Sequence, residues 1–202
     1  MHELLLATGN AGKLREMLDA LGDVPFRVVS LMDMNGLVQA EVEETGRTFE
    51  ENAILKAKTY GDRFHTLTLA EDSGLEVDAL GGRPGVRTAR YARGTDENRY
   101  RKLLGEMKDV PEGKRAARFV TVVAIFDPAN KKLQTCEGEY RGHITLEPRG
   151  SGGFGYDPVF YSDELRKTGA EMSVEEKNTV SHRGRAMAKA RDILLAQYQT
   201  LA

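Results

Sequence analysis

The chain has 202 residues, 40% of them hydrophobic and 30% charged, and its formal net charge is −2 at pH 7. This size allows a large core in one domain, and the small net charge gives no general positive field for binding a nucleic acid polymer. The single cysteine, Cys136, excludes an intramolecular disulfide and suits a reducing compartment. Residues 1–6 resemble neither a signal peptide nor a membrane span, so we expect a cytoplasmic protein with no membrane partner.

Residues 4–7 form the first predicted strand, and a glycine-rich turn follows it. After the turn, apolar residues recur at helical spacing over residues 14–21, which predicts a helix. Backbone N–H groups at a helix N-terminus bind anions, and a lysine there adds a full positive charge. The turn therefore predicts a phosphate site, although similar turns occur without a ligand and the glycine spacing is not that of a Walker A loop. Its residues are Thr8, Gly9, Asn10, Ala11, Gly12 and Lys13.

A second strand is expected at residues 26–30, and a second helix is expected to begin after Thr48. The pattern Thr48-x-x-Glu51 is a capping box, which marks a helix N-terminus. Asn52 and Lys56 are four residues apart and therefore share one face of this helix. Lys56 comes just before an acidic strand in the sequence, although a lysine on a helix is usually only solvated.

The most informative stretch is a short apolar run, residues 67–70, that leads into two adjacent carboxylates, Glu71 and Asp72. We expect a strand that ends at these acids, a turn at Ser73-Gly74, and then another strand. Carboxylates at a strand end line the ligand crevice of many α/β sheets. A pair of carboxylates can bind a hard divalent cation, and one of them can take a proton from a water molecule. A plain polar turn is the alternative, since Asp, Ser and Gly are common turn residues.

The middle of the chain predicts further sheet strands. Residues 96–107 have the pattern of a helix, and residues 118–127 give the longest strand signal. Residues 132–146 are expected to return as antiparallel strands, with Gly138 and Gly142 at bulges or bends. The sheet is therefore expected to be mixed rather than purely parallel.

Residues 150–158 form a second informative stretch, a loop in which glycines flank Phe154. Flanking glycines leave an aromatic ring accessible, and such a ring stacks well on a nucleobase, worth ~1–3 kcal/mol. The alternative is that Phe154 anchors the loop in the core. A short strand is expected at residues 158–161.

The C-terminal part predicts a short helical turn over residues 174–178 and a terminal helix over residues 181–197. Lys177, His182 and Arg183 gather at the start of that helix, and all three are hydrogen-bond donors or potential donors. A single histidine or arginine at a helix start is most often structural.

Together these segments describe a site for a nucleoside triphosphate with Mg²⁺. No catalytic Ser-His-Asp or Cys-His set and no zinc-ligand spacing stands out in the sequence, so hydrolysis by metal-activated water is the simplest chemistry. Six motifs in this order resemble the inosine triphosphate pyrophosphatase family, from residue 8 to about residue 190. The motifs are Thr8-Gly9-Asn10-x-x-Lys13, Glu44-Thr45-Gly46 with Phe49-x-x-Asn52-Ala53-x-x-Lys56-Ala57, Asp72-Ser73-Gly74-Leu75, Gly81-Gly82-x-Pro84-Gly85 with Ala89-Arg90-Tyr91, Ser151-Gly152-Gly153-Phe154-Gly155-Tyr156-Asp157-Pro158, and Ser181-His182-Arg183-Gly184.

The resemblance implies a single domain over residues 1–202, of the α/β class, with a long twisted mixed β-sheet, flanking helices and two lobes around a nucleotide-binding cleft. It implies a Mg²⁺-dependent hydrolase that converts ITP, dITP and XTP to the monophosphate and pyrophosphate. Such a reaction cleanses the nucleotide pool of deaminated purines. The resemblance also implies a homodimer.

Residue roles follow from the same resemblance. Asp72 is expected to be the catalytic base and, with Glu44, a metal ligand, and Ser73 is expected to touch the substrate beside the metal. Glu71 stands where the family often has Asp, which leaves open whether it reaches the metal. The expected triphosphate contacts are Thr8, Gly9, Asn10, Ala11, Gly12, Lys13 and Lys56. The expected base contacts are Phe154, which stacks on the purine, and Gly155, Tyr156, Asp157, Lys177, His182 and Arg183.

Other functions stay open at this point. A related pyrophosphatase for modified pyrimidines or dTTP would keep the phosphate site and differ over residues 154–157 and 177–183, yet both regions match the family. A non-enzymatic nucleotide sensor would bind a triphosphate without using Asp72 as a base.

Overall fold

The computed structural model describes residues 2–33 and 42–198. These residues contain a seven-stranded sheet with the strand order β2-β1-β3-β4-β5-β6-β7. The strands are β1 (His2–Leu6), β2 (Phe26–Ser30), β3 (Leu67–Val77), β4 (Ala116–Asp127), β5 (Lys132–Ile144), β6 (Phe160–Ser162) and β7 (Lys167–Thr168). The α-helices are α1 (Ala11–Leu21), α2 (Phe49–Phe64), α3 (Asp96–Glu106), α4 (Val174–Val180) and α5 (His182–Tyr198). The short 3₁₀ helices are η1 (Asp78–Leu80), η2 (Gly85–Arg90), η3 (Glu112–Lys114) and η4 (Gly169–Glu171).

The sheet is mixed. Strand β1 pairs in parallel with β2 and with β3, and Leu5 lies opposite both Val29 and Thr68. Strand β6 pairs antiparallel with β5 and with β7. Since α-helices flank this sheet, the predicted α/β class with a mixed sheet is confirmed.

The chain divides into two compact units. The first comprises residues 1–72, 121–138 and 183–202, and the second comprises residues 73–120 and 139–182. Strands β3, β4 and β5 contribute residues to both units. Each unit has its own cluster of buried apolar side chains.

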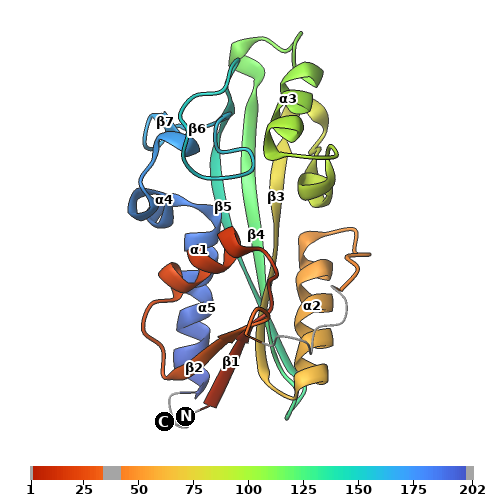
Figure 1. Ribbon diagram of the computed structural model, residues 1–202, viewed down its shortest axis with the longest axis vertical. Helices are drawn as coiled ribbons and strands as arrows, with labels where there is room; N and C mark the ends of the chain where they lie inside the picture. Colours follow the sequence, from red (N-terminus) through yellow and green to blue (C-terminus); the bar gives the residue numbers. More distant parts are fainter. Residues whose placement is uncertain (1, 34–41, 199–202) are drawn as a thin grey trace. The chain divides into compact units, whose positions relative to one another are not determined.

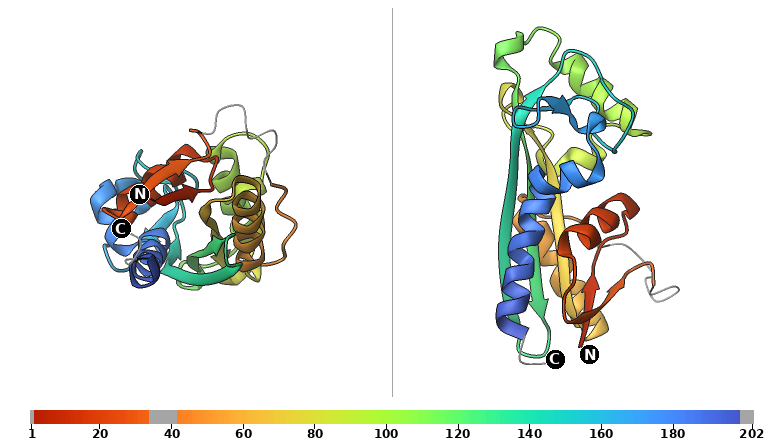
Figure 2. Two further views of the ribbon diagram at one scale, coloured as in Figure 1. Left: turned by 90° about the horizontal axis from the view of Figure 1, so that it is seen from below. Right: turned by 90° about the vertical axis from the view of Figure 1, so that its left-hand side faces the viewer.

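In the first unit, α1 and α5 cover one face of the sheet and α2 covers the other (Figure 1). Ile125 of β4 packs in one cluster with Met17 of α1 and Met187 of α5. The next residue, Phe126, faces α2, because a Cβ on Gly61 of that helix would lie only 2.7 Å from its ring. Neighbouring strand residues thus point to opposite faces. The right-hand view of Figure 2 shows α5 running along the strands.

In the second unit, Leu75 of β3, Leu103 of α3 and Phe160 of β6 belong to one buried cluster. Arg115, directly before β4, is also buried. A buried guanidinium is tolerated when its donors are satisfied. Its nitrogens donate to the backbone carbonyls of Met107, Val110, Ile144 and Thr145.

Strand β3 does not end at the acidic pair. It continues as one strand of 11 residues, so the predicted turn at Ser73-Gly74 is wrong, and so is the alternative of a polar turn. The strand continues because β3 is paired on both sides, with β1 and β4, and its acidic side chains are bound by residues of the helices.

Two further expectations need correction. Residues 132–144 form a single strand, β5, and Gly142 pairs with Ser162 of β6 in regular register, without a bulge. A Cβ at Gly142 would come within 2.1 Å of the Tyr161 carbonyl oxygen on β6. Glycine thus permits close strand pairing at this position. In α1, Leu18 is 44% exposed although it continues the apolar pattern, while the charged Glu16 is buried.

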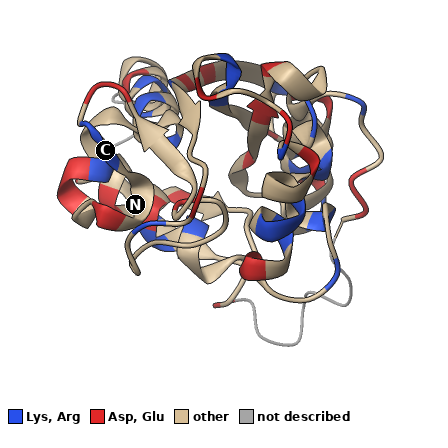
Figure 3. Ribbon diagram, turned by 90° about the horizontal axis from the view of Figure 1, so that it is seen from above, with Lys and Arg blue, Asp and Glu red and all other residues tan. Residues whose placement is uncertain are grey.

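The predicted helix starts are confirmed. The Thr48 hydroxyl accepts a hydrogen bond from the Glu51 backbone N–H, so the capping box begins α2 as expected. A second capping box, Ser173 with Glu176, begins α4. None of the helices within residues 2–33 and 42–198 is long and apolar enough to cross a membrane. Acidic and basic residues are interspersed along the same elements (Figure 3).

Candidate active site

The predicted phosphate turn joins the end of β1 to the start of α1. Asn10 caps the helix, because its side-chain oxygen accepts a hydrogen bond from the Lys13 backbone N–H at 3.0 Å. The Thr8 hydroxyl oxygen accepts from the Asn10 N–H at 3.2 Å. The turn is thereby held in one shape at a helix N-terminus, where an anion is favoured. Its other predicted residues, which are partly or fully exposed, are Gly9, Ala11 and Gly12.

Glu71 and Asp72 are adjacent in β3, so their side chains point to opposite faces of the sheet. Lys13 Nζ of α1 lies 3.0 Å from Glu71 Oε1, whereas Asn52 Nδ2 of α2 donates to Asp72 Oδ2 at 2.9 Å. The two neighbouring carboxylates are therefore bound by side chains from different helices. Ser73 follows in the strand and is half-buried.

Asp72 belongs to a cluster on the α2 side of the sheet. Lys56 Nζ lies 2.7 Å from Glu44 Oε1 and 3.6 Å from Asp72 Oδ1. The buried Asn52 side chain bridges this cluster, since its Oδ1 also accepts from the Gly46 N–H at 2.8 Å. The structure thus brings the two predicted metal ligands together with the predicted phosphate-binding lysine.

The environment of Asp72 favours proton uptake. Burial raises the pKa of its carboxyl group, and the charge of Glu44 adds to this, so the net pKa is raised although Lys56 and Lys13 oppose it. Burial lowers the pKa of Lys56, but the attraction of Asp72 and Glu44 outweighs burial and the net pKa is raised. Lys56 therefore stays charged at neutral pH, while Asp72 is a stronger base than an exposed aspartate.

The donor set of Glu44 and Asp72 fits Mg²⁺, which prefers carboxylate oxygens. Both carboxylates contact the ammonium group of Lys56, so this place already attracts a positive charge. Among residues 2–33 and 42–198, no three His, Cys, Asp or Glu side chains are arranged to hold a metal ion. Mg²⁺ in proteins is usually bound by one or two carboxylates together with substrate phosphates and waters, and Glu44 and Asp72 provide two carboxylates.

On the opposite face of β3, the buried Arg183 of α5 is bound by two carboxylates. Its Nη1 donates to Glu16 of α1, and its Nε lies 3.3 Å from Glu71 Oε2. Burial raises the pKa of Glu71, but the charges of Arg183, Lys13 and Lys56 outweigh burial and hold the net pKa far below its usual range. This group of Lys13, Glu71, Arg183 and Glu16, hereafter the Arg183 cluster, ties α1 and α5 to β3.

In the second unit, the predicted base-stacking residue Phe154 is half-buried in the loop between β5 and β6. Lys177 Nζ lies 4.8 Å from the centroid of its ring, within cation–π distance. The same ammonium donates to Asp157 Oδ2 at 2.6 Å, and this oxygen also accepts from the Phe154 N–H at 2.8 Å. The buried Asp157 carboxylate therefore orders both the loop and the lysine.

The remaining predicted base contacts lie in the same unit, and two of them have ordered side chains. The buried His182 ring stacks on Phe119 of β4, with ring centroids 4.7 Å apart and an interplanar angle of 14°. The Tyr156 hydroxyl donates to the Thr88 carbonyl at 3.0 Å, and burial raises the pKa of this phenol, so it stays protonated. Gly155 has a positive φ of 65°.

Some functional residues are not predicted by the sequence reasoning. Asn52 binds Asp72, and the signal for it is its four-residue spacing from Lys56 on one helix face. Glu16 contacts Arg183 across 167 residues of sequence, and no local pattern indicates such a pairing.

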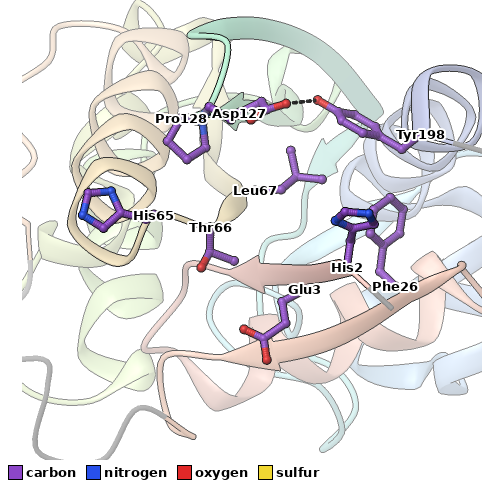
Figure 4. A pocket seen from close by; sticks show the side chains of 10 residues that line it. His2, Glu3, Phe26, His65, Thr66, Leu67, Asp127, Pro128 and Tyr198 are labelled. Atoms are coloured by element: carbon purple, nitrogen blue, oxygen red, sulfur yellow. Dashed lines mark hydrogen bonds between the residues drawn. The ribbon is translucent and has the colours of Figure 1, made fainter. Parts of the chain in front are cut away.

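The first unit also contains a pocket of about 460 Å³ at the starts of β1 and β2 (Figure 4). Its acidic groups are bound within the protein: the Tyr198 hydroxyl donates to Asp127 Oδ2 at 3.3 Å, and Arg27 lies 3.0 Å from Glu3. The pocket contains none of the predicted site residues, because the phosphate turn follows the opposite, C-terminal end of β1.

Comparison with known proteins decides the family. The model of the Ham1 family matches residues 4–193. The chain belongs to the Ham1 family. This membership confirms the family resemblance drawn from the six motifs.

Related Ham1 proteins match almost the whole chain. A protein of Symbiobacterium thermophilum named dITP/XTP pyrophosphatase is 48% identical, over 96% of this chain and 95% of its own length. One of Escherichia coli strain K12 with the same name is 46% identical, over 96% of this chain and 98% of its own length. The solved structure of a HAM1 protein from Coxiella burnetii has a TM-score of 0.88 and 38% identity, covering 97% of this chain and 100% of that chain. The Staphylococcus aureus Ham1 protein gives a TM-score of 0.85 and 36% identity, covering 96% of this chain and 99% of that chain.

Proposed function

We propose that this protein is a nucleoside triphosphate pyrophosphatase that hydrolyses dITP, ITP and XTP to the monophosphate and pyrophosphate. Two relatives named dITP/XTP pyrophosphatase, which are 46% and 48% identical over 96% of the chain, support this proposal. The observation that carries it is Asp72, a buried carboxylate whose raised pKa suits a general base and which lies beside Lys56 and Glu44.

The predicted phosphate contacts and Asp72 supply the chemistry at the phosphate. The turn of residues 8–13 binds phosphate oxygens through the backbone N–H groups at the α1 N-terminus, and Lys56 adds a further cation. Asp72 takes a proton from the water that attacks the α-phosphorus, the bond from that phosphorus to the bridging oxygen breaks, and pyrophosphate leaves. Glu44 and Asp72 would hold Mg²⁺, which would neutralise phosphate charge and lower the pKa of the attacking water. Ser73 contacts the substrate beside the metal.

The predicted base contacts supply recognition of the purine. Phe154 stacks on the purine, within the binding segment of residues 154–157. His182, Lys177 and Arg183 provide hydrogen-bond donors for the 6-keto oxygen of hypoxanthine or xanthine. Adenine has an amino group at that position, so two donors would face each other, and a site built on hydrogen bonds rejects such an analogue strongly. This accounts for the rejection of ATP. Guanine keeps the 6-keto group, so the rejection of GTP must come from its 2-amino group.

We further propose that both units work as one domain and that the enzyme is a cytoplasmic homodimer. The resemblance to the inosine triphosphate pyrophosphatase family supports this assembly. Light scattering coupled to size-exclusion chromatography tests it: a mass twice that of the 22.4 kDa chain is expected, and a monomer at micromolar concentration contradicts it.

The experiment that tests the function incubates the purified protein with Mg²⁺ and each of ITP, XTP, dITP, GTP, ATP and dTTP, and identifies the products by chromatography. We expect monophosphate and pyrophosphate from ITP, XTP and dITP, and little turnover of ATP and GTP. Diphosphate and phosphate as products would contradict the proposed role of Asp72. Tight ITP binding without turnover would indicate a nucleotide sensor instead.

A further inference from the structure

The loop that carries Phe154 is fixed from α3 by a carboxylate. The Gly155 N–H donates to Asp96 Oδ2 at 2.7 Å, a short distance typical of a charge-assisted hydrogen bond. Asp96 is the first residue of α3, and its other oxygen, Oδ1, lies 3.1 Å from Arg99 Nη2 one turn along the helix. Arg99 thereby limits the rotation of the carboxylate that receives the loop.

Two carboxylates bind consecutive peptide groups on either side of the Phe154 side chain. Asp157 accepts from the Phe154 N–H at 2.8 Å, and Asp96 accepts from the Gly155 N–H. The adjacent glycines have positive φ angles, 69° at Gly153 and 65° at Gly155, so the backbone follows a path that other residues rarely adopt. With both N–H groups held, the direction of the Phe154 Cα–Cβ bond is set by the loop anchors.

We propose that Asp96 is a positioning residue for the aromatic platform of the site: it holds the Gly155 peptide so that Phe154 presents its ring to the purine. This inference rests on the proposed function, in which Phe154 stacks on the base. Asp96 contacts no substrate in this account. It acts through Phe154 and influences how tightly the base is held, not the chemistry at the phosphate.

A purely structural role for Asp96 in α3 is the competing explanation. An acidic residue in the first turn of a helix interacts favourably with the helix dipole wherever it points. Glu97 provides a matched control, because it occupies the same turn and pairs with Arg101 at 2.7 Å on the exposed surface. If the helix dipole explains the role of Asp96, removing either acid has the same effect. If Asp96 anchors the loop, only its own removal has an effect.

The test measures steady-state hydrolysis of dITP by the full-length enzyme and its variants Asp96→Ala, Asp96→Asn and Glu97→Ala. We expect Asp96→Ala to raise KM roughly tenfold with a small change in kcat, since it removes a hydrogen bond to a charged group. Asp96→Asn keeps an acceptor oxygen and is expected to restore most of the affinity. Glu97→Ala is expected to behave as the wild type. Inhibition by pyrophosphate, which lacks a base, is expected to be unchanged in all three variants.

A double-mutant cycle with Phe154→Ala separates the two explanations. If Asp96 acts through Phe154, adding Asp96→Ala to Phe154→Ala raises KM no further. KM increases that multiply in the double variant, or a KM increase in Glu97→Ala equal to that in Asp96→Ala, would overturn the inference.

Hydrogen exchange of the free protein gives a readout without turnover: Asp96→Ala is expected to speed exchange in peptides containing Gly155. A wild type that does not hydrolyse dITP refutes the proposed function. Unchanged exchange at Gly155 refutes the loop anchor itself.

Discussion

Replacing Arg183 by Met is expected to lower the free energy of unfolding by about 3 kcal/mol, the lower end of the range for breaking a buried ion pair. The Arg183 side chain is 3% exposed and that of Glu71 is 0% exposed. Without the guanidinium, Glu16 loses its contact with Arg183, while Glu71 keeps its contact with Lys13, at 3.0 Å. That remaining contact is why we expect the lower end of the range.

Urea unfolding at pH 7, followed by circular dichroism because the chain has no tryptophan, measures the loss. Arg27→Met is the matched control. Arg27 is 70% exposed where it pairs with Glu3, so its removal is expected to cost under about 1 kcal/mol. Equal losses in Arg183→Met and Arg27→Met would refute the reasoning.

The same cluster predicts a pH dependence. Because the pKa of Glu71 is lowered in the folded state, its ionised form stabilises the fold at pH values above the unfolded-state pKa of 4.5. This contribution is lost as the pH falls through the lower, folded-state pKa. Glu71→Gln is therefore expected to be destabilised at pH 7 and to lose less further stability on acidification than the wild type. Parallel stability curves for the two proteins below pH 5 would contradict this.

Three further predictions concern single side chains. Asp72→Asn is expected to lower kcat by about 10²–10⁴ while nucleotide binding survives, and a near-normal kcat would remove Asp72 from the role of base. Phe154→Ala is expected chiefly to raise the KM for dITP, and an unchanged KM would mean that stacking does not provide the affinity. Burial raises the pKa of the Cys136 thiol to about 11, so its alkylation by iodoacetamide at pH 8 is expected to be about 100-fold slower in the folded than in the urea-unfolded protein. Equal labelling rates would show that the thiol is not shielded.

Local signals predicted much of the fold. The capping box at Thr48 gave the start of α2, and the apolar run after Arg118 gave the strand β4. The same kind of reasoning placed a turn at Ser73-Gly74, because these residue types favour turns in isolation. Sheet pairing on both sides of β3 outweighs that preference, and tertiary context commonly does so in strands.

The grouping of the site residues depends on tertiary contacts. Once β3 is known to continue past the acids, the two-residue period of a strand alone predicts that Glu71 and Asp72 point to opposite faces of the sheet. No periodic sequence pattern predicts that Arg183 contacts Glu16, since Glu16 is on α1 near the other end of the chain. The contact between Asp96 and Gly155 spans 59 residues, and neither residue type marks it. Long-range polar contacts of this kind require the folded arrangement.

The most direct test of the central claim is to let the enzyme hydrolyse dITP in ¹⁸O-labelled water with Mg²⁺ and weigh both products by mass spectrometry. Attack of water on the α-phosphorus, with Asp72 as the base, predicts that the label enters the deoxyinosine monophosphate and that the pyrophosphate stays unlabelled. Label found in the pyrophosphate would place the attack on the β-phosphorus and contradict the account.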